Sequence, residues 1–263
     1  MEAKPVALAR IALALAGVAS LVLCVGFVLE AGWATALWPW PERPLSYVFL
    51  GSIAAAIALP LLWIAATGEL AAAAAGALNL TVTYTGATVY LIAISGQSWQ
   101  PPLGPAIAVC VAAGLISLTV FLATRRLPFR DERPMPRLVR GSFFVFAGAL
   151  IASGAGLVLG ADVFPWPIDR DSSALYGFIF LGAAVYFLYG ALRPRWANAA
   201  GQLVGFLAYD LVLILPFIAR FGEVSGGDLV SLTIYTTFVL CSGGLAAYYL
   251  VRQRAAPATP ADG

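Results

Sequence analysis

The residue with the clearest chemical potential is Asp210, an acid near the middle of the apolar stretch Phe-Leu-Ala-Tyr-Asp-Leu-Val-Leu. A charge at the centre of a bilayer costs about 2.5–3.5 kcal/mol on insertion scales. We therefore expect this side chain to face protein or a water-filled cavity and to be neutral or hydrogen-bonded. Two interpretations are open. Asp210 binds a proton, a cation or a substrate, or it makes an interhelical hydrogen bond that holds a bundle together.

A second group of polar residues follows a helical spacing on another apolar stretch. Asn79, Thr83, Gly86 and Tyr90 are separated by four, three and four positions, so they share one face of a helix. This face can line a polar path, or its small and polar side chains can pack helices closely. We expect it to pack against the stretch that carries Asp210. A hydroxyl or amide of this helix is then the expected hydrogen-bond partner of Asp210, from Asn79, Thr83 or Tyr84.

The stretch around Asp210 has its own face of small and polar residues. Gly201, Gly205 and Tyr209 share that face, and Gln202 lies beside it. Glycines at this spacing are typical of close helix packing in membranes. The two stretches together predict a polar intramembrane site formed by Asp210, Tyr209, Gln202, Asn79, Thr83 and Tyr84.

The composition argues against an enzyme. Histidine is absent, which removes His-based catalytic pairs, bis-His haem and most zinc sites. Asp210 and Asp228 resemble the paired acids of intramembrane aspartyl proteases. However, Ser225 replaces the first glycine of that family's Gly-x-Gly-Asp motif, and Asp228 is expected at the end of its helix, far from Asp210. Two carboxylates that share a catalytic water must be close together. We predict no catalytic residues, no cofactor and no metal.

The elements that position these residues are membrane-spanning helices. Only 11% of the 263 residues are charged, whereas a soluble domain carries about 25%. About 20 apolar residues suffice for a helix to span a bilayer. The sequence predicts an all-α polytopic membrane bundle with eight transmembrane helices at 6–29, 46–67, 70–95, 104–124, 140–160, 174–193, 199–219 and 227–250.

Basic residues are distributed unevenly between the loops. If the N-terminus is cytoplasmic, only Arg43, Arg170 and Arg220 of the fifteen Lys and Arg residues fall outside. The positive-inside rule then places both termini in the cytoplasm. We expect a multi-pass protein of the plasma (inner) membrane, with the lipid bilayer as its partner and no nucleic acid. The sequence points to no particular solute, protein partner or oligomeric state.

Repeated motifs predict that the chain consists of two similar halves. Residues 38–41, Trp-Pro-Trp-Pro, and residues 164–167, Phe-Pro-Trp-Pro, each follow the first helix of a half, 126 positions apart. Phe-Leu-Gly at 49–51 recurs at 180–182. Tyr84 matches Tyr209 at a shift of 125, which places Thr85 opposite Asp210. Each half has an even number of spans, so the repeat is parallel, with its pseudo-twofold axis along the membrane normal.

The two Pro-Trp-Pro loops are expected to be stiff, because proline fixes its own φ and restricts the residue before it. An aromatic belt at the headgroup level would explain their tryptophans. Alternatively, the two loops meet and cap a cavity that opens outward, with Trp38, Trp40, Phe164 and Trp166 as the candidate cap.

Two tandem four-span units with such loops resemble a group of uncharacterised bacterial multi-pass membrane proteins. The resemblance covers the whole chain, rests on the loop motif and implies no activity. The expected organisation is a first four-helix repeat (1–124), a cytoplasmic basic linker (125–138), a second four-helix repeat (139–250) and a disordered cytoplasmic tail (251–263). The leading hypothesis is transport or small-solute binding at a polar site between the third and seventh helices. The alternative is a non-catalytic membrane subunit or scaffold whose polar residues serve only helix packing.

Overall fold

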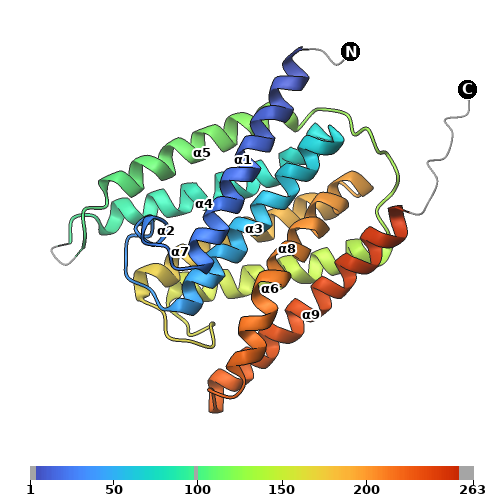
Figure 1. Cartoon of the computed structure of the whole chain (residues 1–263). Helices are drawn as coiled ribbons and strands as arrows, with labels where there is room; N and C mark the ends of the chain where they lie inside the picture. The colour runs from blue at the N-terminus through green and yellow to red at the C-terminus, as the bar shows by residue number, and fades with distance from the viewer. Residues whose placement is uncertain (1–3, 98–99, 255–263) are drawn as a thin grey trace, which may run out of the picture.

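The computed structural model describes residues 4–97 and 100–254, and eight helices in that part of the chain are long and apolar enough to cross a membrane (Figure 1). A short helix, α2 (Gly32–Thr35), follows the first span, and the turn η1 (Leu70–Ala72) leads into the third. The chain is therefore an integral membrane helical bundle, as the sequence predicts. The spans are α1 (Lys4–Val28), α3 (Pro44–Thr67), α4 (Ala73–Ile94), α5 (Gly104–Thr124), α6 (Arg137–Leu159), α7 (Arg170–Leu192), α8 (Trp196–Arg220) and α9 (Gly226–Arg254).

Proline and glycine set several helix ends. Pro44 occupies the first turn of α3, where its missing N–H has no helical partner to lose. Gly68 ends the same helix in the left-handed conformation with φ 74°, and Gly160 ends α6 with φ 88°. Residues with a Cβ rarely adopt such φ values, so these two glycines stop their helices at fixed positions.

The helix bounds revise the expected divisions of the chain by a few residues. The helix α6 begins at Arg137, inside the expected linker 125–138, and α9 continues to Arg254, inside the expected tail 251–263. Residues 255–263 of that tail lie outside the described residues.

The eight spans form two layers. In one layer α1, α3, α8 and α9 pack side by side in that order, and in the other the order is α5, α4, α7 and α6 (Figure 1). Each layer thus takes two helices from each half of the chain. The helices differ in how much of their most apolar stretch is buried. The buried share is 56% in α3 and 50% in α7, but only 6% in α5. The helices α3 and α7 therefore lie at the centre, and α5 lies at the lipid-facing edge.

Two glycines, one in each half of the chain, allow close contacts between neighbouring helices. A Cβ on Gly51 of α3 would lie 2.7 Å from Val28 Cγ2 of α1, and a Cβ on Gly177 of α7 would lie 2.7 Å from Val158 Cγ2 of α6. Gly182, the third residue of the second Phe-Leu-Gly motif, packs against Thr83 and Asn79 of α4 instead.

Two arginines also make equivalent contacts. The Arg10 Nε of α1 donates to the carbonyl oxygen of Ala65 in α3 at 2.7 Å. The Arg140 Nε of α6 donates to the carbonyl oxygen of Ala191 in α7 at 2.9 Å. Each arginine thus satisfies a carbonyl in the last turn of a central helix, where a helix has carbonyls without an internal partner.

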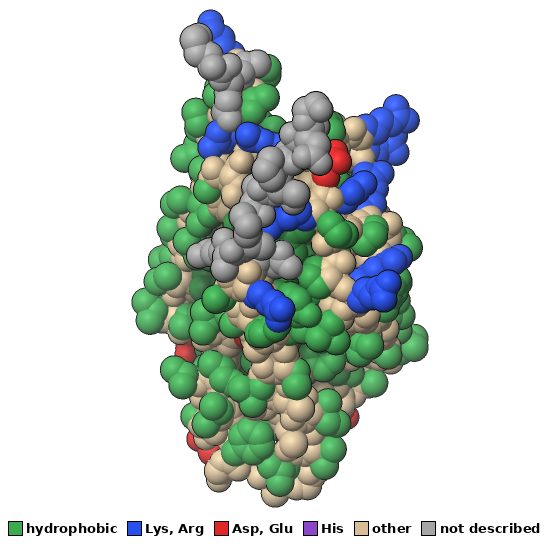
Figure 2. All heavy atoms as spheres, turned by 90° about the vertical axis from the view of Figure 1, so that its right-hand side faces the viewer, with side chains coloured by type: hydrophobic (Ala, Val, Ile, Leu, Met, Phe, Trp, Pro, Cys, Tyr) green, Lys and Arg blue, Asp and Glu red, His purple; other side chains and the backbone are tan. Residues whose placement is uncertain are grey.

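One end of the bundle, called here the basic end, carries most of the Lys and Arg side chains (Figure 2). It includes the linker strap, residues 125–136, which joins the halves. The buried carboxylate of Glu69 accepts hydrogen bonds from the backbone N–H groups of Arg130 (3.0 Å) and Asp131 (3.1 Å) in that strap. The hydrogen-bonded guanidinium of Arg133 holds the pKa of Asp131 below its usual range. The strap is therefore fastened to the turn between α3 and α4.

The far end of the strap is fastened to the other half of the chain. The Met135 N–H donates to the Pro194 carbonyl at 2.9 Å, and the Trp196 N–H donates to the Arg133 carbonyl at 2.7 Å. The strap consequently bridges the turn between α3 and α4 and the turn between α7 and α8.

Candidate functional site

A cavity of about 430 Å³ lies between the two layers, within the range of roughly 300–1,000 Å³ that is typical of ligand pockets. Helices α3 to α9 contribute to its wall. The wall is mostly apolar, and it includes nine aromatic side chains: Trp38, Tyr84, Phe180, Tyr186, Phe187, Phe206, Tyr209, Tyr235 and Phe238.

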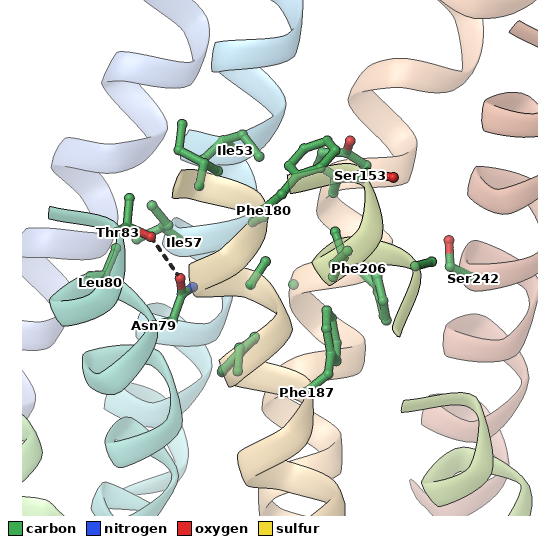
Figure 3. Close-up of a pocket in the computed structure, with 18 of the residues that line it drawn as sticks. Ile53, Ile57, Asn79, Leu80, Thr83, Ser153, Phe180, Phe187, Phe206 and Ser242 are labelled. Carbon is green, nitrogen blue, oxygen red and sulfur yellow. Dashed lines mark hydrogen bonds between the residues drawn. The ribbon is translucent and has the colours of Figure 1, made fainter. Parts of the chain in front are cut away.

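All the residues of the predicted polar site line this one cavity: Asp210, Tyr209, Gln202, Asn79, Thr83 and Tyr84. They do not form a single cluster. Figure 3 shows Asn79 and Thr83 of α4 on one side and Ser242 of α9 on the other, with phenylalanine side chains between them. The cavity therefore has polar groups at separate places along an apolar wall.

Asp210 lies at the α9 side of the cavity and is 5% exposed. It is ten residues from the end of α8 at Arg220, which is about 15 Å at 1.5 Å per residue, so it is close to the middle of the membrane. Its Oδ2 accepts a hydrogen bond from the Ser242 hydroxyl at 2.9 Å. Its Oδ1 is buried and has no hydrogen-bond partner among the described residues. The expectation that Asp210 faces the interior and is hydrogen-bonded is confirmed.

Gln202 places a second acceptor on the cavity wall, two helical turns before Asp210. Its Nε2 donates to the Tyr186 carbonyl at 2.6 Å, whereas its Oε1 is buried without a partner among the described residues. Next to Asp210 on the same helix, the Tyr209 hydroxyl lies 2.5 Å from the Tyr235 hydroxyl, and this contact joins α8 to α9. Two side chains of α8 on the cavity wall thus each have a buried acceptor oxygen without a partner among the described residues.

The polar face of α4 packs elsewhere than expected. Thr83 Oγ1 donates to the Phe178 carbonyl of α7 at 3.3 Å, and Tyr90 donates to Asp171 at the start of α7 at 2.5 Å. The prediction that this face packs against the helix of Asp210 is wrong, because α4 lies against α7 and α8 lies against α3. Asn79, Thr83 and Tyr84 are accordingly not partners of Asp210, and Ser242 of α9 takes that place.

Thr85, the residue that the predicted repeat aligns with Asp210, has different surroundings. Thr85 is exposed on the outside of the bundle and is not part of the cavity wall. Asp210, by contrast, is covered by α9, where a Cβ on Gly243 would lie 3.1 Å from its Oδ2. The acid is therefore present only in the half where the outer helix covers it.

The two Pro-Trp-Pro loops meet at the end of the bundle opposite the basic end, called here the tryptophan end. Trp38 of the first loop donates its indole N–H to the hydroxyl of Ser172 in α7 at 3.1 Å. Trp166 of the second loop donates to the hydroxyl of Ser46 in α3 at 3.0 Å. Each loop is thus bonded to the central helix of the other half. In the second loop, the ring centroid of Phe164 lies 4.7 Å from that of Trp166.

The four candidate cap residues have different roles in this arrangement. Only Trp38 among them reaches the cavity wall, and its ring stacks on Tyr176 at 5.2 Å. Trp40 instead donates to Gln100, whose amide donates in turn to Asp171. Trp99, which precedes Gln100 in the chain, lies outside the described residues.

Several residues of the site were not identified from the sequence. Ser242 lies in a run of small residues, Cys-Ser-Gly-Gly, and a serine in a membrane helix gives no indication of its partner. Tyr186 and Tyr235 are not part of a regularly spaced polar pattern that would have identified them as site residues. Their contribution depends on which helices are neighbours, and the sequence leaves that order open.

Comparison of this chain with protein-family models, with curated proteins and with solved structures found no match.

Proposed function

We propose that this protein binds a small solute in the cavity between its two layers and carries it across the plasma (inner) membrane. The observation that supports this most is the buried, unpartnered Oδ1 of Asp210 on the wall of a cavity of about 430 Å³. A protein that used Asp210 only for packing would be expected to satisfy both oxygens, since an unsatisfied buried acceptor costs about 1–3 kcal/mol.

The internal repeat is part of this proposal. The paired contacts of Gly51 and Gly177, and those of Arg10 and Arg140, recur with closely similar sequence shifts. They support two halves related by a duplication. A site between related halves is how many transporters place a substrate at the membrane midplane. We also propose that the protein is not an enzyme, because its sequence contains no histidine and its cavity wall has a single carboxyl group among the described residues.

The competing proposal is a non-catalytic scaffold, and one observation favours it. Asp210 joins α8 to α9 through Ser242, which is what an interhelical packing bond would do. The variant Asp210→Asn separates the two proposals. A scaffold would keep its stability and have no solute binding to lose, whereas a solute-binding protein would keep its fold and change its binding.

The test uses three compounds with one apolar body and different head groups: 4-phenylbutylamine, 4-phenylbutan-1-ol and 4-phenylbutyrate. Binding of each labelled compound is measured to the parent protein in lipid nanodiscs. The variant Ala149→Phe fills the cavity from α6, and Ala152→Phe places the same side chain on the exposed face of that helix. We expect saturable binding of at least one compound that weakens at least tenfold in Ala149→Phe and stays within threefold of the parent in Ala152→Phe. The proposal is overturned if none of the compounds distinguishes Ala149→Phe from Ala152→Phe.

Transport is tested separately from binding. The compound that binds best is loaded outside proteoliposomes, and its uptake is compared between the parent and Ala149→Phe. Faster uptake by the parent supports a carrier. If the parent binds the compound but takes it up no faster than Ala149→Phe, the protein would be a receptor or sensor and not a carrier.

The orientation is also a proposal, supported by the gathering of Lys and Arg at the basic end. In a cysteine-free parent, a cysteine at Glu132 of the linker strap should resist an impermeant thiol reagent applied to intact cells. One at Asp162, in the loop before α7, should react. The opposite labelling would place both termini outside.

A further inference from the structure

We infer that the solute is a monovalent organic cation, an ammonium group with N–H donors on an elongated apolar body. This inference rests on the proposed function, because it names the class of solute that the same cavity would take. It is carried by the hydrogen-bonding needs of the wall, its charge and its aromatic lining.

The unpaired polar atoms of the wall are acceptors, so they require hydrogen-bond donors from a ligand. Asp210 and Gln202 of α8 both line the cavity, and each has a buried acceptor oxygen without a partner among the described residues, Asp210 Oδ1 and Gln202 Oε1. A bound group that brings N–H donors would satisfy them, whereas a carboxylate, phosphate or ether oxygen would leave them unpaired. An unpaired acceptor costs about as much as a lost hydrogen bond, so the wall selects for donors.

The charge of the wall points in the same direction. Asp210 is the one formally charged side chain among the described residues that line the cavity. No Lys or Arg accompanies it on that wall, and its hydrogen-bond partner Ser242 is neutral. An isolated carboxylate in this position needs either a proton or a cation from outside. One acid balances one positive charge, which favours a monocation over a diamine.

A metal ion fits the site poorly. The described residues include no group of three or more His, Cys, Asp or Glu that could hold one. Hard cations such as Ca²⁺ and Mg²⁺ take six or more oxygen ligands, and the surroundings of Asp210 on this wall are mostly apolar and aromatic.

The aromatic lining favours an organic cation. Nine aromatic side chains face the cavity, and the face of such a ring attracts an ammonium group by about 0.5–2 kcal/mol. Phe187 and Phe206 stack with their centroids 4.3 Å apart and lie between the two sides of the cavity (Figure 3). They form an apolar surface on which the body of a ligand can lie.

The separation of the two acceptors gives the length of the ligand. Gln202 and Asp210 are eight residues apart on α8, a rise of about 12 Å at 1.5 Å per residue. A ligand with its ammonium group at Asp210 and its apolar chain directed toward Gln202 would span this distance. A second, uncharged donor at the far end of the ligand would satisfy the Gln202 oxygen.

The three phenylbutyl compounds test the head group at constant body. An alkylamine has a pKa of about 10.4, as lysine does, so 4-phenylbutylamine is a cation at pH 7. In the parent we expect it to bind at least tenfold more tightly than 4-phenylbutan-1-ol and 4-phenylbutyrate. In Asp210→Asn we expect the preference for the amine to disappear, while the affinity for the alcohol stays within threefold of the parent. The control Ser242→Ala keeps the carboxylate and should keep at least a tenfold preference for the amine.

If Asp210→Asn does not fold, the inference can be tested in the parent protein alone. Lowering the pH protonates the carboxyl and should weaken amine binding while leaving alcohol binding unchanged. The other titratable groups near Asp210 are Tyr209 and Tyr235, and tyrosines ordinarily titrate near pH 10, so they do not contribute in the acid range.

The outcomes distinguish this inference from the function on which it rests. If the alcohol or the carboxylate binds as tightly as the amine and Ala149→Phe abolishes that binding, the cavity binds solutes but the cation inference is overturned. It is equally overturned if Asp210→Asn keeps the preference for the amine, or if amine affinity does not fall with pH. If no compound responds to Ala149→Phe, the proposed function itself fails.

Discussion

The substitution Glu69→Gln should release the linker strap from the turn between α3 and α4. The Glu69 carboxylate is 4% exposed and accepts the backbone N–H groups of Arg130 and Asp131 at 3.0–3.1 Å. In glutamine one of the two oxygens becomes an NH2 group that cannot accept a hydrogen bond, and the bonds to the remaining oxygen lose their charge. A hydrogen bond to a charged group is worth about 1.5–3 kcal/mol. We therefore expect the strap to open more readily by about that free energy.

Trypsin cleavage after Arg130 measures this opening. When opening is fast relative to cleavage, the cleavage rate follows the population of the open form. A change of 1.5–3 kcal/mol corresponds to a factor of roughly 10–150, since 1.4 kcal/mol is tenfold. The control is Glu132→Gln, the same change on an exposed residue of the strap, which should cleave within about twofold of the parent. Equal cleavage rates for the two variants would refute the assignment of Glu69 as the fastening of the strap.

Three further predictions concern the contacts between helices. Gly177→Ala should destabilise the protein by about 1–3 kcal/mol in denaturant unfolding, because its Cβ would meet the backbone of α6 at 2.7 Å. Gly148→Ala on α6 has open space at its Cβ and should not destabilise the protein, because alanine is the better helix former. Ser172→Ala leaves a tryptophan N–H at the tryptophan end without its partner, at a cost of about 1–3 kcal/mol, and unchanged stability would contradict the role of that bond. Thr85→Asp exposes an acid to lipid and should reduce membrane insertion by about 2.5–3.5 kcal/mol, whereas an insertion yield equal to that of Thr85→Asn would contradict the exposure of this site.

Hydropathy predicted the spans well because the requirement behind it is simple. A helix that crosses a bilayer needs enough apolar length and internally satisfied backbone groups. The eight expected runs therefore match the eight helices, with ends that move by up to four residues, as at Arg170 and Arg254. Those ends depend on caps and turns, which hydropathy does not measure.

The arrangement of the helices was harder to predict, because nearly every face of an apolar helix can be buried in protein or exposed to lipid. The face of Asn79, Thr83 and Tyr90 was correctly recognised as one face, but its neighbour is α7. Sequence order suggests that α3 packs on α4, yet α3 packs mainly on α1 and α8. The interleaving of the halves into two layers exchanges the expected neighbours, and with them the expected partner of Asp210.

The unequal environments of Thr85 and Asp210 connect the architecture to the proposed site. In a bundle built from two similar halves, a polar group needed at the centre could occur twice. Of the two positions that the predicted repeat aligns, Thr85 is exposed on the bundle surface and Asp210 is covered by α9, so a carboxyl is shielded from the surroundings only at Asp210. A cavity with one acid has one place for a cationic head group, which fixes the direction in which a ligand lies. In the proposed function, this difference between Thr85 and Asp210 is what would let a wide apolar cavity select the charge and the orientation of its ligand.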